Sequence, residues 1–198
     1  MKMTIIAAAM ASLMASQGVV YRWTDDTGVT RASTSLAAIP EKHRQSAVEM
    51  KVVNVDDNSV EAMSTPKGYG AAEISFRPGA ERTEAMAVFN GRAERMAIVD
   101  TGAGIMAITR KLARALGYKP ENLPRSWIIT SAGKLKVPMV TLDSVRIGGA
   151  EARKVRAAVI DFEGRGPVSA VIGMSFLSAF VMEVDSMAGA MTLSSKGR

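Results

Sequence analysis

From residue 74 onward the chain consists of short apolar or β-branched runs separated by tight turns. The strongest hairpin signal is Asn90-Gly91 between the runs 86–89 and 95–99, because Asn-Gly suits a type I′ turn. Further runs of this kind lie at 74–76, 127–130, 136–140, 141–147, 155–160, 170–172, 181–184 and 191–193. One segment, 110–116, has helical periodicity. Many short strands with one short helix predict a mostly β barrel or sandwich.

The part before residue 74 has a different organisation. Residues 19–31 predict a hairpin whose turn is Asp25-Asp26-Thr27-Gly28, and residue 41 follows a Pro that predicts a helix start. From 56 the sequence becomes polar and contains Pro, Ser and Gly. We therefore expect a small N-terminal domain at 18–55, a linker at 56–72 and the main domain at 73–196.

The first residues are typical of a targeting segment. A short basic start is followed by the uncharged apolar run 4–15, which is shorter than the roughly 20 residues of a membrane span. With Ala15 and Ser16 near a cleavage point, residues 1–17 predict a signal peptide, or an uncleaved membrane anchor if the run continues through residue 20. A buried helix is the third alternative. Either of the first two exports the rest of the chain.

Composition excludes several kinds of site. The chain has no cysteine and one histidine, His43, which we expect to be solvated. A disulfide scaffold, a thiol nucleophile and a Cys- or His-rich metal site are therefore not expected. The net charge is +6, but no basic run is interleaved with aromatic residues, so nucleic acid is not an expected partner. Attraction to an acidic partner or an anionic membrane surface stays open.

The tripeptide Asp-Thr-Gly occurs twice, in different settings. The first copy, 26–28, lies in the predicted hairpin turn. The second copy, 100–102, directly follows the apolar run 96–99. A polar loop at the end of a buried strand is a place where a rigid scaffold holds a carboxylate in a fixed position. Asp100 is therefore the candidate chemical group, and Asp26 is not.

A second marker lies 73 positions after Asp100. Residues Val171, Ile172 and Gly173 form the end of an apolar strand and are followed by a short helix-like segment. A strand of this kind can pass behind the first loop and support it. Three other carboxylates beside strand ends, Asp143, Asp161 and Asp185, favour surface turns over catalytic partners.

The second Asp-Thr-Gly copy, followed by the apolar strand that ends at Gly173, resembles the motifs of the retropepsin-like aspartic proteases, in particular bacterial members located in the cell envelope. The resemblance covers residues 85–193 and includes AIVDTGAGI, VTLDSVRIGG and VIGMSFLSAF. The segment 21–25 with Gly28 is similar to a small domain of unknown function found in envelope proteins.

The resemblance implies a single-lobed acid-protease barrel with Asp100 as the catalytic carboxylate and no cofactor or metal. It also implies roles for three groups of residues. The active-site loop would be supported by Thr101, Gly102 and Ala103, of which Thr101 would brace the loop across a dimer. The strand Val171, Ile172 and Gly173 would support the loop from behind. A flap over the substrate would be formed by Thr130, Ser131, Ala132 and Gly133.

Two departures concern substrate binding. Gly104 and Ala132 stand where relatives usually carry polar side chains, which puts specificity in doubt but leaves the chemical step intact.

The expected activity is peptide-bond hydrolysis. Two carboxylates about 3 Å apart share one proton and so supply an acid and a base together. One lobe supplies one such Asp, so a homodimer with a twofold axis at Asp100 is implied. The alternative is a retropepsin-like dimerisation or peptide-binding module without enzymatic activity. We expect a polypeptide substrate and a location in the periplasm or at the inner membrane facing it, with membrane association through the N-terminus as the open alternative.

Overall fold

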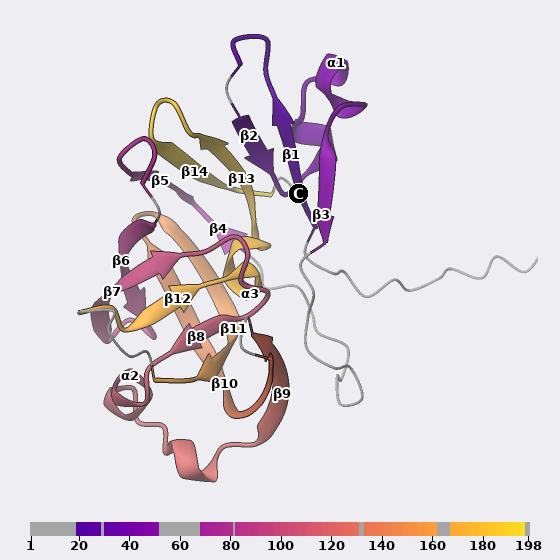
Figure 1. Ribbon diagram of the computed structural model, residues 1–198. Helices are drawn as coiled ribbons and strands as arrows, with labels where there is room; N and C mark the ends of the chain where they lie inside the picture. Colours follow the sequence, from indigo (N-terminus) through magenta and orange to yellow (C-terminus); the bar gives the residue numbers. More distant parts are fainter. Residues whose placement is uncertain are drawn as a thin grey trace, which may run out of the picture.

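The computed structural model describes residues 19–28, 30–51, 68–80, 82–130, 133–161 and 167–196 (Figure 1). Within these ranges the protein is mostly β, so the predicted fold class is confirmed. The predicted signal peptide or anchor, residues 1–17, lies outside the described residues. Among the described residues, no helix has the length and hydropathy required to cross a membrane.

A closed barrel of six strands forms the centre of the molecule. The order around the ring is β11-β8-β12-β7-β6-β10, and the pairing of β10 with β11 closes it. The six strands are β6 (Thr83–Phe89), β7 (Ala93–Val99), β8 (Met106–Ile108), β10 (Gly133–Ile147), β11 (Ala150–Val159) and β12 (Ala170–Ile172). Two further strands, β4 (Gly68–Tyr69) and β9 (Arg125–Thr130), extend the sheet from β11 and β10.

The long strand β10 makes this closure possible. Its first part pairs with β9 and its second part pairs with β11 and briefly with β6. The runs 136–140 and 141–147, which the sequence predicts as separate strands, are therefore one strand. The hairpin predicted at Asn90-Gly91 connects β6 and β7, and both turn residues have the positive φ that a type I′ turn needs.

A second sheet has the order β13-β14-β5 and packs beside the barrel. Its strands are β13 (Phe180–Asp185), β14 (Ala190–Ser195) and β5 (Ala71–Ser75), and the one-turn helix α3 (Met174–Leu177) precedes β13. Strand β4 and the start of β5 lie inside the predicted linker 56–72. The end of that prediction is wrong, because glycines and alanines at 68–72 pair with β11 and β14 although they have no strand pattern.

The N-terminal sheet has the order β2-β1-β3. Strands β1 (Val19–Thr24) and β2 (Thr30–Ser33) form the predicted hairpin, whereas β3 (Val48–Lys51) was not predicted. The 3₁₀ helix η1 (Leu36–Ala38) and the one-turn helix α1 (Glu41–Arg44) lie between β2 and β3. The predicted helix after Pro40 is therefore only one turn long.

The N-terminal sheet docks on strand β13, at the end of the molecule opposite helix α2 (Arg110–Ala115; Figure 1). The Thr34 hydroxyl donates a hydrogen bond to the Phe180 carbonyl (2.6 Å) and accepts one from the Met182 N–H (3.3 Å). Val20, which is buried, joins the same apolar core as the barrel. Thr34 provides hydrogen bonds to two backbone groups of β13. The N-terminal sheet and the β13-β14-β5 sheet therefore form one connected body.

The helix predicted at 110–116 is α2 (Arg110–Ala115), followed by the 3₁₀ helix η2 (Pro120–Asn122). Helix α2 begins after Thr109, whose hydroxyl accepts a hydrogen bond from the Leu112 N–H (3.2 Å), as an N-cap residue does. The helices α1 and α3 lie at the helix start predicted after Pro40 and in the helix-like segment predicted after Gly173, and each has only four residues.

Candidate active site

Asp100 is the first residue after strand β7. The strand lies between β6 and β12, and its last three residues, Ala97, Ile98 and Val99, are buried. The strand is therefore a rigid support whose backbone is paired on both sides. Asp100 itself is exposed, so the structure presents a solvent-accessible carboxylate at the end of a buried strand.

Backbone hydrogen bonds hold the loop that contains Asp100. The Asp100 N–H donates to the Ile172 carbonyl (3.0 Å), which continues the parallel pairing of β7 with β12. The Ala103 N–H donates to the Asp100 carbonyl (3.2 Å), and the Gly102 N–H donates to Asp100 Oδ1 (2.9 Å). The main chain and the carboxylate of Asp100 are thus both positioned. A Cβ at Gly102 would lie 3.2 Å from the same Oδ1 atom, so glycine fits there best.

Strand β12 and Gly173 lie directly against this loop, as the supporting strand was expected to do. A Cβ at Gly173 would lie 2.6 Å from the Ala103 carbonyl oxygen and 2.7 Å from the Ile105 carbonyl oxygen. Real side chains do not approach backbone so closely, so only glycine permits this contact. The Met174 N–H then donates to the Ala103 carbonyl (2.8 Å).

Ser175 is a supporting residue that the sequence analysis missed. Its hydroxyl accepts a hydrogen bond from the Met106 N–H (2.9 Å) and donates one to the Arg156 carbonyl (2.8 Å). It therefore ties α3 to β8 and β11 behind the loop. The segment that follows Gly173 contains two serines, Ser175 and Ser178, among apolar residues, and this pattern does not indicate which of them has distant partners.

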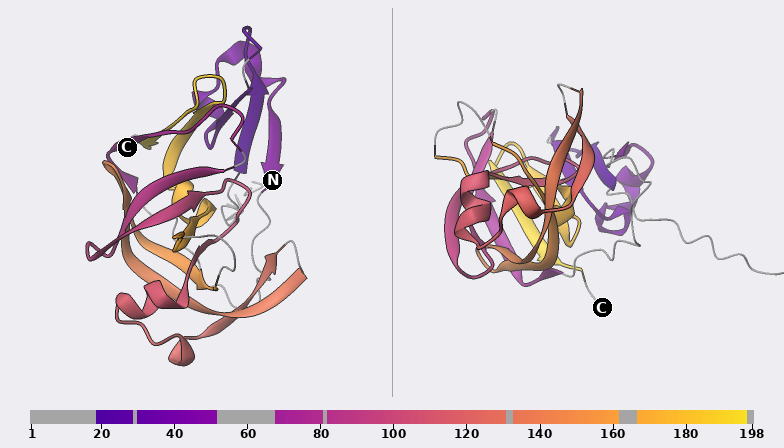
Figure 2. Two further views of the ribbon diagram at one scale, coloured as in Figure 1. Left: turned by 60° about the vertical axis from the view of Figure 1, so that its left-hand side comes forward. Right: turned by 90° about the horizontal axis from the view of Figure 1, so that it is seen from below.

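The predicted flap is the hairpin of β9 and β10, which projects from the body of the protein (Figure 2). Thr130 and Gly133 are opposite each other at its end, and the Thr130 hydroxyl donates to the Gly133 carbonyl (2.9 Å). Ser131 and Ala132, the other two predicted flap residues, lie outside the described residues.

The base of this hairpin packs close to the active-site loop. Ile128 and Val137 belong to a small apolar cluster that also contains Met139 and Ala158 and packs against Ile105. Ile105 lies only a few residues after Asp100. The structure therefore brings the loop of Asp100, the hairpin and the supporting strand together, although they are far apart in sequence. Thr101 and Ala103 are half-buried in this loop.

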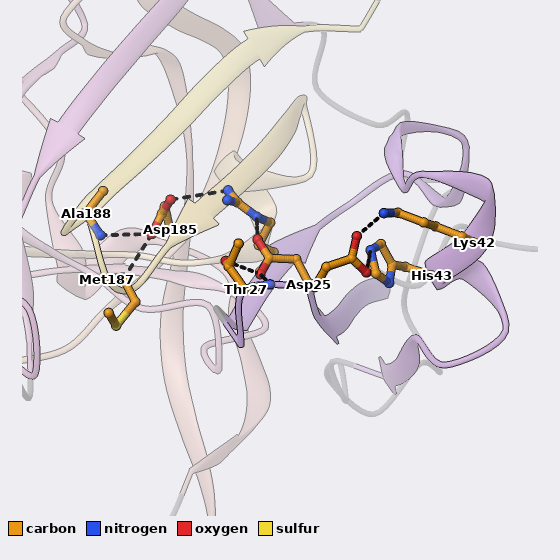
Figure 3. A network of polar contacts seen from close by, with 9 residues as sticks. Asp25, Thr27, Lys42, His43, Asp185, Met187 and Ala188 are labelled. Carbon is orange, nitrogen blue, oxygen red and sulfur yellow. Dashed lines mark hydrogen bonds and ion pairs between the residues drawn. The ribbon is translucent and has the colours of Figure 1, made fainter.

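The first Asp-Thr-Gly copy lies in the turn between β1 and β2. Figure 3 shows the polar contacts of this region. The carboxylate of Asp26 binds the Lys42 ammonium, and its Oδ1 atom lies 3.4 Å from His43 Nε2. The pKa of Asp26 is lowered, chiefly because Lys42 donates this hydrogen bond. His43 was expected to be solvated, which is wrong: its side chain is 11% exposed, because it packs beside this turn.

Asp25, next to Asp26, organises the same turn. Asp25 Oδ1 accepts hydrogen bonds from the Thr27 N–H (2.9 Å) and the Thr27 hydroxyl (2.6 Å). Asp25 Oδ2 accepts one from Arg31 Nε (2.7 Å), and Arg31 also lies 3.3 Å from Asp185 of β13. The first copy is thus part of a structural turn connected to the second sheet.

The other three carboxylates have structural contacts. Asp143 accepts a hydrogen bond from Lys154 Nζ (2.8 Å), which lowers the pKa of Asp143. Asp161 accepts one from the Arg110 N–H (3.0 Å), at the start of α2. Asp185 accepts one from the Ala188 N–H (2.8 Å), in the turn between β13 and β14. Asp161 and Asp185 lie beside the ends of strands, as predicted, but Asp143 lies inside strand β10 (Gly133–Ile147), so the surface turn expected there is wrong.

Comparisons with known proteins find two family models that match parts of the chain and one similar solved structure. Residues 85–176 match the family model described as "Aspartyl protease", and residues 6–67 match the model described as "Domain of unknown function (DUF4124)". The chain is similar to a solved structure of a retropepsin-like aspartic protease from Rickettsia conorii. The sequence identity is 24%, the match covers 66% of this chain and 94% of that chain, and the TM-score is 0.49.

Among curated proteins no match is found. The family model spans Asp100, the β9–β10 hairpin and the strand that ends at Gly173. Residues 85–176 therefore have the sequence pattern of the aspartyl protease family, which confirms the predicted resemblance.

Proposed function

We propose that this protein is an aspartic endopeptidase whose active site forms between two copies of the chain, each contributing Asp100. The observation that carries the proposal is the exposed Asp100 carboxylate on a loop held by β12 and by its own backbone hydrogen bonds. Positioning of this kind is what a catalytic group needs, because misplacement of about 1 Å lowers the rate strongly. The family match of residues 85–176 supports the same reaction.

The chemistry follows from pairing two carboxylates. Two carboxylates about 3 Å apart share one proton, since both cannot be ionised together at that distance. The ionised carboxylate removes a proton from water, and that water oxygen attacks the carbonyl carbon of the scissile peptide bond. The protonated carboxyl donates its proton to the carbonyl oxygen. When the tetrahedral intermediate breaks down, the C–N bond is cleaved and the nitrogen takes up a proton, which yields a carboxylic acid and an amine.

A second copy of the chain is the proposed source of the second carboxylate. Asp26, the other Asp-Thr-Gly aspartate, binds Lys42 in the N-terminal sheet and belongs to a turn. A twofold axis brings identical residues together, so Asp100 of one copy would face Asp100 of the other. The Thr101 hydroxyl would brace the two loops across the axis, and Gly102 and Ala103 would keep the backbone close to the substrate.

The β9–β10 hairpin is the proposed flap. Its base packs against Ile105, so a movement of the hairpin would change the packing of the active-site loop. Closure of such a hairpin over a bound polypeptide excludes water other than the attacking molecule. Thr130 to Gly133 would contact the substrate backbone at the tip.

The location and the role of the N-terminal part belong to the same proposal. With residues 1–17 acting as a signal peptide or an anchor, the protease would act on polypeptides in the bacterial envelope, in the periplasm or at the inner membrane. The N-terminal sheet docks on β13 through Thr34 and would travel with the protease domain.

The first test is peptide cleavage by the chain on a complex peptide library, at mildly acidic and neutral pH. The Asp100→Asn protein is measured alongside, and Asp26→Asn is the matched control because it alters the same tripeptide. Cleavage by the native chain and by Asp26→Asn, but not by Asp100→Asn, is the expected result. Cleavage that survives in Asp100→Asn rejects the proposal. Inactivity of the folded, dimeric native chain favours a binding module instead.

A mixing experiment tests the dimer. Native chain and Asp100→Asn chain are combined at constant total concentration and left to exchange partners. With equal amounts of each, a site shared by two copies leaves about a quarter of the activity, because only native pairs are active, whereas a site within one copy leaves about half. An activity proportional to the native fraction contradicts the shared site while leaving Asp100 catalytic.

A further inference from the structure

The outer face of the β9–β10 hairpin carries side chains that have no role in the proposed protease chemistry. The hairpin projects from the barrel, so one of its two faces is directed away from the rest of the molecule (Figure 2). We infer that this outer face binds an anionic lipid bilayer. The inference is independent of the proposed protease function, since it rests on other side chains of the hairpin.

The strand register defines the two faces. Ile128 is opposite Leu135, while Trp127 is opposite Lys136 and Ile129 is opposite Lys134. Directly opposed residues share a face and alternate residues lie on opposite faces. Ile128 is buried in the cluster at the base of the hairpin, so its face is the inner one. Trp127, Ile129 and the two lysines therefore lie on the outer face.

Two large apolar side chains are exposed on this outer face. Trp127 is 48% and Ile129 is 49% exposed, and the Lys136 ammonium lies 5.9 Å from the centre of the Trp127 ring. Single exposed apolar residues are common and need no explanation. A neighbouring Trp and Ile bordered by lysines is the composition of a surface that enters the headgroup region of a membrane. The lysine stems can extend along the apolar side chains while their ammonium groups stay at the phosphates.

The charge of the hairpin matches an anionic partner. Residues 125–138 include Arg125, Lys134 and Lys136 and contain no Asp or Glu. Basic residues near an anionic bilayer each add to the attraction. A protein partner fits less well, because a stable protein interface buries about 800 Å² on each side and two exposed apolar side chains cover much less. A bilayer needs only these side chains and the flanking charges.

The chain itself supplies the probe for the test. It contains two tryptophans, and Trp23 is 5% exposed whereas Trp127 is on the outer face. A Trp23→Phe full-length chain therefore reports on Trp127 alone. It is mixed with vesicles of phosphatidylcholine with 30% phosphatidylglycerol, about the charge of an anionic membrane, and with vesicles of pure phosphatidylcholine. The Trp127 emission is expected to shift to shorter wavelength and to become protected from acrylamide only with the anionic vesicles.

This readout separates the hairpin from the N-terminal segment. Residues 1–17 are predicted to be a signal peptide or a membrane anchor, so co-sedimentation of the full chain would not identify the hairpin, whereas the depth of Trp127 in the bilayer does. If Trp23→Phe does not fold, the native chain is used and the signal of a Trp127→Phe chain is subtracted.

Charge-matched variants sharpen the result. In the Trp127 reporter, Lys134→Gln with Lys136→Gln is expected to weaken binding to the anionic vesicles by about tenfold or more. Arg22→Gln with Lys42→Gln removes the same charge from exposed positions of β1 and α1, at the other end of the molecule, and is expected to change binding about twofold or less.

Three outcomes overturn the inference. The first is a Trp127 that stays accessible to acrylamide in the presence of anionic vesicles. The second is an equal weakening by both charge pairs, which would indicate attraction by net charge alone. The third is a blue shift with poly-glutamate and none with vesicles, which would indicate an acidic polypeptide as the partner of this face.

Discussion

The two Asp-Thr-Gly copies have the same three residues and opposite surroundings. Asp26 lies in the turn of the three-stranded N-terminal sheet, and its exposed carboxylate binds Lys42. Asp100 follows a strand that is paired on both sides inside the barrel, and its carboxylate accepts a hydrogen bond only from the Gly102 N–H among the described residues. The tripeptide therefore defines a turn, and the strand before it decides whether that turn can hold a catalytic group.

The support behind each turn also differs. The Asp100 loop rests on Gly173 of the neighbouring chain segment, with backbone contacts that leave no room for a side chain. Gly28, in the first copy, has open space around it and φ of +83°. One glycine is needed for close packing and the other for backbone conformation. This difference can be measured.

The largest expected difference between the two Asp-Thr-Gly copies is the effect of their aspartates on peptide cleavage. Asp100→Asn is expected to lower kcat/KM by at least about a thousandfold, because the shared proton and the general base are lost together. Asp26→Asn should stay within about twofold of the native value, since its carboxylate only binds surface cations. Both proteins are assayed on one peptide identified in the library, with circular dichroism as the control for folding. Equal losses in the two variants would remove the distinction between the copies.

Substitutions of Gly173 and Gly28 should differ in how much they lower the free energy of unfolding. Gly173→Ala is expected to lower the free energy of unfolding by about 3 kcal/mol, because the new methyl group overlaps the Ala103 and Ile105 carbonyl oxygens. Gly28→Ala should cost about 1 kcal/mol, which is the conformational penalty of a positive φ. Urea denaturation measures both. A smaller loss for Gly173→Ala than for Gly28→Ala would contradict the tight packing behind the Asp100 loop.

Asp25 tests the structural role of the first copy. Asp25→Ala removes the acceptor of three hydrogen bonds, from the Thr27 N–H, the Thr27 hydroxyl and Arg31 Nε. The Asp25 side chain is 15% exposed, so we expect a loss of about 1.5 kcal/mol in the free energy of unfolding. Peptide cleavage at a temperature where the variant stays folded should be unchanged. A fall in cleavage without a fall in stability would connect the N-terminal sheet to the active site.

The smallest expected effect is the pH dependence of Asp26. Its pKa is lowered in the folded protein, so its contribution to stability is present above the unfolded pKa of about 3.9 and is lost as the pH falls through the lower folded value. Asp26→Asn lacks this contribution at every pH. The difference in unfolding free energy between native and variant should therefore shrink from pH 5 to pH 3, as measured by urea denaturation. A difference that grows on acidification would contradict the lowered pKa.

Much of the barrel could be predicted because its signals are local. The hairpin at Asn90-Gly91 depends on two residues with positive φ, and α2 depends on an N-cap at Thr109 and on apolar spacing. The missed elements lack such signals. Strand β8 has three residues, all buried, so no alternation is visible, and β4 has two residues that form a strand only because β11 pairs with them.

The candidate site shows the same division. Asp100 and Gly173 could be found from the sequence because each follows an apolar strand and has a residue type that chemistry or packing requires. Ser175 could not be found, since its hydroxyl acts on Met106 and Arg156, which are far away along the chain. The outer face of the hairpin also depended on the register, because the sequence does not say which of Trp127 and Ile128 faces inward.

By itself, the sequence determined the mostly β class, the principal turns, the helix α2 and the residues expected at the active-site loop, because these depend on neighbours along the chain. Only the tertiary structure decided that β10 closes the barrel, that Gly173 lies against Ala103, and that Thr34 docks the N-terminal sheet on β13. Those contacts join residues far apart in sequence, and their energy comes from burial and hydrogen bonds that exist only after the chain has folded.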